Sequence, residues 1–167
     1  MSTAATRLVA SVLGAGYLTP APGTWGSAAA LPMAWALHIA GGPAALALAT
    51  VAAFALGWWA TARELAATDD PDPSWIVIDE VAGMWIRLLP VSFGATHAGV
   101  EVTALWPGWV MAFLAFRLFD IWKPGPVGWA DRRGGAFGVM LDDILAGLFA
   151  ALAVLAGAAL AHGAFGA

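Results

Sequence analysis

Long apolar runs fill most of this chain and leave little surface that could face water. A membrane-crossing helix needs about 20 mostly apolar residues. Five stretches approach that length: residues 26–40, 44–62, 75–94, 103–119 and 144–161. The first is short and is interrupted by Pro32, so four or five helices qualify. We therefore expect an all-α fold, a polytopic membrane helical bundle with four to five transmembrane helices, formed as a single domain over residues 1–167.

The composition agrees with a membrane protein and excludes other classes. Charged residues make up 11% of the chain, whereas soluble domains carry about 25%. The net charge is -4 and the Lys and Arg residues are scattered, which argues against nucleic-acid binding. The absence of cysteine excludes disulfides, thiolate metal sites and a cysteinyl-phosphate intermediate.

The basic residues predict an orientation, because cytoplasmic loops of membrane proteins carry an excess of Lys and Arg. With a cytoplasmic N-terminus and five crossings, the cytoplasmic side holds Arg7, Arg63, Lys123, Arg132 and Arg133. The loops expected on the opposite side, residues 41–43 and 95–102, contain neither Lys nor Arg. The loops that carry the polar motifs are therefore expected at the cytoplasmic face.

Charged residues begin the third apolar stretch, where hydrocarbon would make them costly. Asp79 and Glu80 stand at its start and Arg87 lies further along. Such residues usually mark a charge pair, a water-filled cavity or a bound ion. Glu80 falls near Arg87 around a helical wheel, so an internal ion pair that only fixes helix packing is the structural alternative.

Two further polar groups stand where other apolar stretches begin or end. Arg117 and Asp120 are three residues apart and can share a helix face, with Lys123 following before two prolines. Asp142 and Asp143 follow a glycine-rich approach and are expected in the first turn of the last helix, where capping would explain one of them.

The segment before the first stretch has the features of an anion site. A proline-rich turn leads to Thr24 and Ser27, either of which can cap the helix that follows. Free N–H groups at a helix N-terminus favour phosphate. An ordinary capped turn explains the same residues.

Acids and bases therefore gather at one predicted face. The acids are Asp79, Glu80, Asp120, Asp131, Asp142 and Asp143. Mg²⁺ favours such oxygen ligands and typically uses one or two carboxylates together with waters and phosphate oxygens. Nearby Lys and Arg side chains would hold the remaining phosphate charge, and this combination indicates phosphoryl chemistry on a lipid headgroup.

Three sequence blocks resemble the phosphatidylglycerophosphatase A family. They are Thr-Pro-Ala-Pro-Gly-Thr-Trp-Gly-Ser at 19–27, Ile-Val-Ile-Asp-Glu-Val-Ala-Gly-Met-Trp at 76–85, and Phe-Arg-Leu-Phe-Asp-Ile-Trp-Lys-Pro at 116–124 continuing to Gly-Val-Met-Leu-Asp-Asp at 138–143. The resemblance covers about residues 14–147. It implies a bacterial inner-membrane enzyme that uses Mg²⁺ to hydrolyse phosphatidylglycerophosphate to phosphatidylglycerol and phosphate in phospholipid biosynthesis.

The resemblance also implies roles by matching position. The catalytic candidates are Asp79, Glu80, Asp120, Asp142 and Asp143, with Asp131 as a further acid. The metal ligands among them are Asp79, Glu80, Asp142 and Asp143. The residues expected to bind the substrate phosphate are Thr24, Ser27, Arg117 and Lys123. Residues 68–74 and the tail beyond residue 149 lie outside the match and carry no functional expectation.

Other functions remain open at this stage. They are a lipid-headgroup phosphotransferase, a cation-coordinating membrane transporter and a structural membrane subunit. Histidine chemistry is disfavoured, because His38, His97 and His162 are expected away from the acidic face. The residues do not choose between attack by water and an acyl-phosphate intermediate, and they leave the number of metal ions, the oligomeric state and the acyl-chain preference open.

Overall fold

The fold is helical throughout the part of the chain that the structure describes. The structure, a computed structural model, describes residues 2–165, with the side chains of residues 2–161. Its α-helices are α1 (Ala4–Ala10), α2 (Pro22–Leu65), α3 (Ile78–Ala98), α4 (Trp106–Trp122), α5 (Pro126–Asp131) and α6 (Gly135–Phe165). Short 3-10 turns, η1 (Ala15–Tyr17) and η2 (Val102–Leu105), precede α2 and α4. The predicted all-α class is confirmed.

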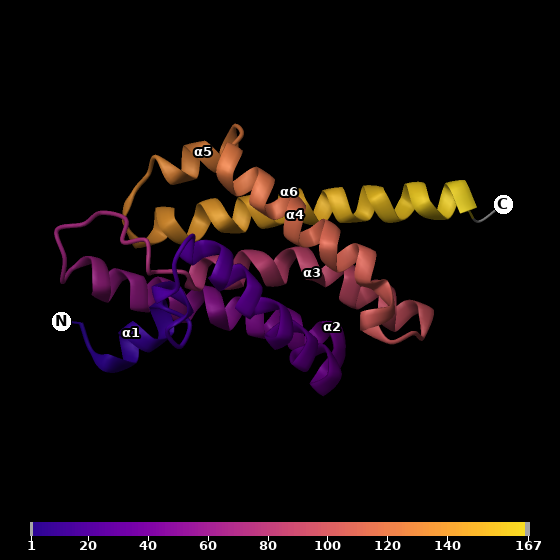
Figure 1. The fold of residues 1–167 in the computed structure, drawn as a ribbon, viewed down its shortest axis with the longest axis horizontal. Coiled ribbons are helices and arrows are strands. Elements are labelled where there is room, and N and C mark those ends of the chain that lie inside the picture. The colour runs from indigo at the N-terminus through magenta and orange to yellow at the C-terminus, as the bar shows by residue number, and fades with distance from the viewer. Residues whose placement is uncertain (1, 166–167) are drawn as a thin grey trace.

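Helix α2 combines the first two predicted membrane spans. It runs for 44 residues, but Gly41 and Gly42 have non-helical backbone angles, with a φ of 62° at Gly42 that favours glycine. Figure 1 shows the chain turning back at this break, so that α2 has two arms and both of its ends lie toward the same end of the molecule. The predicted turn at residues 41–43 is therefore present.

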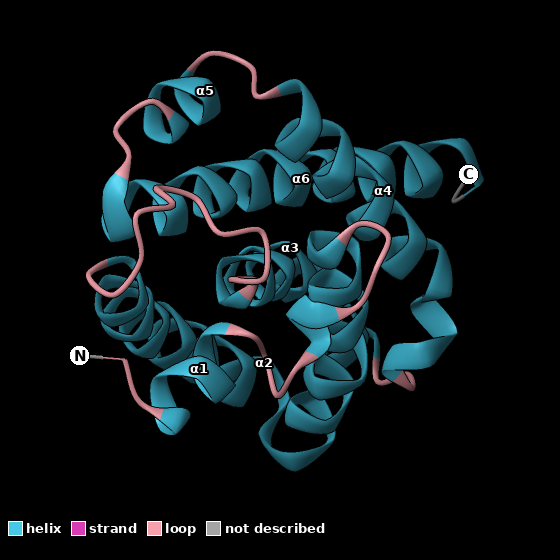
Figure 2. Cartoon of the chain, turned by 60° about the vertical axis from the view of Figure 1, so that its left-hand side comes forward, coloured by secondary structure: helices cyan, strands magenta, loops and turns pink. Residues whose placement is uncertain are grey.

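Within the described residues, three helices are long and apolar enough to cross a membrane, namely Pro22–Leu65, Val102–Trp122 and Gly135–Ala161. The third predicted span is also a helix, α3, but it is not among these three. Most of its side chains are buried, and it packs against α2, α4 and α6. Figure 2 shows α3 near the centre of the bundle. The coarser prediction, a membrane protein, is supported; the count of four to five crossings stays a prediction.

Close backbone contact fixes α3 against α6. A Cβ atom added at Gly83 would lie 2.7 Å from the carbonyl oxygen of Asp143, and one added at Gly147 would lie 2.6 Å from the carbonyl oxygen of Gly83. Real Cβ atoms do not approach other atoms so closely, so each position excludes a side chain. Helices in lipid associate through such close packing, because lipid provides little hydrophobic drive between them.

Two predictions about helix starts are wrong. Helix α6 begins at Gly135, so Asp142 and Asp143 lie inside it and its first turn contains no acid. Glycines 134 and 135 supply the left-handed turn, after which nothing interrupts the helix. Helix α2 begins at Pro22, whose fixed φ suits a first helical position, so neither Thr24 nor Ser27 is its cap.

We expect Gly83→Ala to destabilise the protein, because its methyl group would force α3 and α6 apart. Overpacking of this kind costs about 1–3 kcal/mol. The unfolding temperature in detergent measures the effect. Gly94→Ala, on the same helix, is the matched control, because its added Cβ would lie an ordinary 3.6 Å from Leu105. Equal unfolding temperatures for the two variants would contradict the packing described above.

Candidate active site

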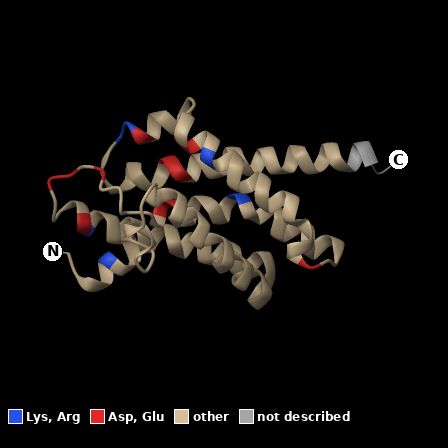
Figure 3. Ribbon diagram, in the orientation of Figure 1, with Lys and Arg blue, Asp and Glu red and all other residues tan. Residues whose placement is uncertain are grey.

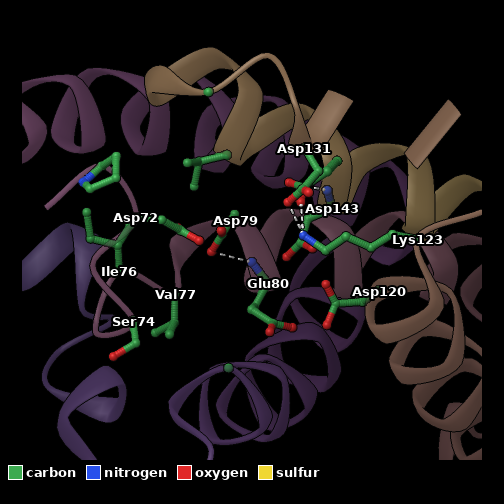
Figure 4. A pocket seen from close by; sticks show the side chains of 15 residues that line it. Asp72, Ser74, Ile76, Val77, Asp79, Glu80, Asp120, Lys123, Asp131 and Asp143 are labelled. Carbon is green, nitrogen blue, oxygen red and sulfur yellow. Dashed lines mark hydrogen bonds and ion pairs between the residues drawn. The ribbon is translucent and has the colours of Figure 1, made fainter. Parts of the chain in front are cut away.

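The charged residues gather at one end of the bundle. Figure 3 shows Lys, Arg, Asp and Glu mostly toward the end where α1 and α5 lie, and few at the other end. A cavity of about 420 Å³ opens there. Its lining includes Asp72, Asp79, Glu80, Asp120, Lys123, Asp131, Asp142 and Asp143. Figure 4 shows most of these side chains converging on the cavity from α3, α4, α6 and the intervening loops.

Glu80 connects three helices at the floor of this cavity. Its carboxylate accepts a hydrogen bond from the Ser27 hydroxyl of α2, at 2.5 Å, and another from Nη1 of Arg117 in α4, at 2.7 Å. The same Nη1 lies 2.9 Å from Oδ2 of Asp120. A side chain at Gly23 would overlap the Glu80 carboxylate and would displace it from this position.

Lys123 connects a second group of acids. It follows the last turn of α4 in a left-handed conformation, and its ammonium pairs with Asp131 of α5 and, at 2.8 Å, with Oδ2 of Asp142 in α6. Burial alone would lower the pKa of Lys123, but the hydrogen bonds to Asp131 and Asp142 outweigh it and raise that pKa above its ordinary value. Lys123 therefore stays charged throughout the physiological range.

Asp79 and Asp143 differ from the other helical acids of the cavity. Among the described residues, neither forms an ion pair with a cation. Oδ1 of Asp79 accepts the backbone N–H of Glu80 at 2.9 Å. Oδ2 of Asp143 is buried without a hydrogen-bond partner in the described part of the chain. A buried carboxylate oxygen left this way is normally satisfied by a ligand, a water or an ion.

Arg87 lies beneath the acids, without the partner that the sequence suggested. Glu80 pairs with Arg117, so the structure does not form the Glu80 and Arg87 ion pair that the sequence offered as the structural alternative. The Arg87 side chain is fully buried, with Cζ 3.3 Å from the centre of the Phe116 ring. Its Nε donates to the Met84 sulfur, while Nη1 and Nη2 have no hydrogen-bond partner among the described residues.

The structure brings together most of the residues that the sequence proposed for the site. All five predicted catalytic acids line the cavity, as do Asp131 and Lys123. Arg117 and Ser27 do not line it but hold Glu80. Thr24 is half-buried near the start of α2 and does not line the cavity.

Sequence reasoning missed the loop after α2. Pro71, Asp72 and Ser74 form one wall of the cavity, although this segment carried no expectation. The available signal was its acidic run of Asp69, Asp70 and Asp72 directly before the block that contains Asp79.

The histidines lie elsewhere. His38 forms a hydrogen bond of 2.6 Å with Ser92, and His97 lines an apolar cavity between α3, α4 and α6. The side chain of His162 lies outside the described residues.

The donor set of the cavity fits a hard divalent cation. Within the described residues, no three acidic or histidine side chains form a ready ligand cluster. Mg²⁺ does not require one, since it typically keeps several waters and uses one or two carboxylates with phosphate oxygens. The unpartnered Oδ2 of Asp143 and the nearby Asp79 supply oxygen donors of that kind.

Fold and cavity together define a helical membrane protein whose carboxylate-rich site suits a phosphate ester bound with cations. The sequence profile described as Phosphatidylglycerophosphatase A matches residues 8–158, and the chain belongs to this family. The resemblance found in the sequence is therefore confirmed.

Individual relatives align with this chain over most of their own length. Phosphatidylglycerophosphatase A of Haemophilus influenzae is 33% identical over 151 residues, covering 90% of this chain and 86% of the relative. The Escherichia coli protein of the same name is 35% identical over 157 residues, covering 87% and 78%. A Bacteroides thetaiotaomicron protein, provisionally described as a phosphatidylinositol-3-phosphatase, is 37% identical over 147 residues, covering 85% and 86%. No solved structure matches this chain.

We expect Arg117→Met to lower the free energy of unfolding at neutral pH by about 3 kcal/mol, because it leaves the buried Glu80 carboxylate without its counter-ion. The deficit relative to the unmodified protein should shrink toward about pH 5, because a protonated Glu80 no longer needs a counter-ion. Thermal unfolding in detergent at both pH values measures this. Arg132→Met, at an exposed position, is the control. A deficit that does not change with pH would contradict the charge-pair explanation.

Proposed function

We propose that this chain removes the terminal phosphate of phosphatidylglycerophosphate by Mg²⁺-dependent hydrolysis, yielding phosphatidylglycerol. The observation that carries the proposal is the acid-lined cavity at one end of a membrane bundle, with Lys123 at its wall and Arg117 behind it. A phosphate monoester carries about 1.5 to 2 negative charges at neutral pH and would be repelled by these acids alone. Cations in the cavity reverse that repulsion. Membership of the family supports the substrate.

The acids of the cavity supply the proposed metal ligands. Asp79 and Asp143, which lack cation partners among the described residues, are the best placed to hold Mg²⁺, with Glu80 and Asp142 beside them. When bound, Mg²⁺ neutralises developing charge on the phosphate and orients or activates water.

Protein groups supply the remaining functions. Ser27 and Arg117 hold the Glu80 carboxylate in one orientation. The Lys123 ammonium can donate to a phosphate oxygen from the cavity wall. An acid close to the phosphate would accept the proton of the attacking water.

The position of the acids favours an enzyme over the transporter that the sequence left open. A cation pathway requires polar groups through the membrane interior, whereas the acids here lie mostly toward one end (Figure 3). A second lipid phosphomonoester deserves a direct test, because the Bacteroides relative carries a phosphoinositide phosphatase description. Phosphatidylinositol 3-phosphate is therefore the comparison substrate.

We expect detergent-purified protein to release phosphate from phosphatidylglycerophosphate with Mg²⁺ and not with excess chelator. Asp143→Asn should lower kcat by about 100-fold or more while leaving the unfolding temperature near that of the unmodified protein. Asp69→Asn is the matched control, because Asp69 is exposed and does not line the cavity. Absence of release from folded protein would remove the proposed function, and faster release from phosphatidylinositol 3-phosphate would change its substrate.

We further propose that the protein lies in the bacterial inner membrane with four to five crossings and with the cavity at the cytoplasmic face. The supporting residues are Arg7 in α1, Arg63 in the last turn of α2, Lys123 after α4, and Arg132 and Arg133 after α5. Basic residues of this kind favour the cytoplasmic side.

Because the chain contains no cysteine, single cysteines can report this orientation. We expect Arg132→Cys to react with a membrane-impermeant maleimide in inside-out vesicles but not in intact spheroplasts. Val100→Cys, in the loop at the other end of α3 and 42% exposed, should show the reverse. Labelling of both positions from one side would contradict the proposed topology.

A further inference from the structure

A shallow apolar groove lies on the outside of the bundle between the first arm of α2 and the start of α4. Its volume is about 260 Å³, and it is lined by Leu31, Pro32, Trp35, Thr103, Trp106 and Trp109. The indole N–H of Trp109 donates to the Val102 carbonyl at 3.0 Å, so that polar group is satisfied within the protein. Thr103 supplies the only hydroxyl in this lining. The groove therefore suits a hydrocarbon ligand.

The same two helices lead from this groove to the acidic cavity. Gly23 of α2 and Asp120 of α4 line the cavity, and both helices pack against α3. Twelve residues separate Gly23 from Trp35, and eleven separate Trp109 from Asp120, which correspond to about 18 Å and about 17 Å of helix. The hydrocarbon of a bilayer is about 30 Å thick, so the chains of one leaflet span about 15 Å. An acyl chain has the length needed to connect the two sites.

We propose that this groove binds one acyl chain of the phospholipid whose phosphate lies in the acidic cavity. The inference rests on the proposed function, because that function places a lipid headgroup between α2, α3 and α4. The groove would then fix the depth and direction of the lipid. Recognition of both the phosphate and a chain would favour membrane lipids over water-soluble phosphate esters.

A larger apolar cavity does not offer the same path. It measures about 520 Å³ and lies between α3, α4 and the far end of α6. Between it and the acids, Phe116, Ala146 and Ala150 form a buried cluster that fills the space where α4 meets α6. The chain of a lipid held at the acidic cavity would have to cross this packed cluster, whereas the α2 and α4 groove lies on the outside of the bundle.

Two adjacent residues of η2 provide a matched test. Thr103 and Ala104 are both exposed, but Thr103 lines the groove and Ala104 lines the larger cavity. We expect Thr103→Trp to raise KM for dioleoyl phosphatidylglycerophosphate by about tenfold, equivalent to about 1.4 kcal/mol, by removing packing contacts with the chain. KM for the dioctanoyl substrate should change little, and Ala104→Trp should leave both values near those of the unmodified protein.

A second measurement does not depend on turnover. Phosphatidylglycerophosphate with a diazirine near the end of one acyl chain should crosslink to peptides that contain residues 31–35 and 103–109. Excess dioctanoyl phosphatidylglycerophosphate should suppress this crosslink, while phosphatidylcholine should not. A crosslink that phosphatidylcholine suppresses equally, or equal KM changes for long and short chains, would overturn the groove assignment. If the unmodified protein formed the crosslink but released no phosphate, the result would instead contradict only the proposed function.

Discussion

The charge network around Glu80 is the interaction on which the arrangement of the site depends. Glu80 belongs to α3, Ser27 to α2 and Arg117 to α4, so one carboxylate joins three helices at the same end of the bundle. A buried carboxylate without these partners would be strongly unfavourable. Lys123 likewise joins three helices, α4, α5 and α6, through its ion pairs with Asp131 and Asp142. The two networks meet at one cavity, whereas the opposite end of the bundle is held mainly by apolar contacts.

Helix packing sets the distances within which these networks can form. Because Gly83 and Gly147 allow α3 and α6 to touch through their backbones, Asp143 comes beside the acids of α3. A larger residue at either glycine would move Asp143 away from the acids of α3. The small residues of α3 and α6 therefore determine how close the acids of the two helices lie, as well as how the helices pack.

The sequence predicted the helical class, the turn at residues 41–43 and seven of the eight charged residues that line the cavity, because apolar length and clustered charges are local signals. Prediction from the sequence failed where contacts between residues far apart in the chain determine the structure. The alternative considered for Glu80 was an ion pair with Arg87, seven residues away on one helix, but its partner is Arg117, 37 residues away on another. Asp72 was not predicted as a site residue, because its loop reaches the cavity only after α2 folds back. The start of α6 was misplaced because glycines were interpreted as a loop, although most of them are helical.

Arg87 shows how the protein tolerates so many acids in an apolar setting. Its guanidinium is buried in α3 below the cavity, where it interacts electrostatically with Glu80 and Asp143 without bonding to either. A lysine could not occupy this position equally well, because the flat guanidinium stacks on the Phe116 ring and is more weakly hydrated than an ammonium. The charge therefore offsets the carboxylates from beneath while leaving the oxygen of Asp143 free of a protein partner in the described structure. A direct ion pair at that oxygen would occupy the donor that the proposed Mg²⁺ would use.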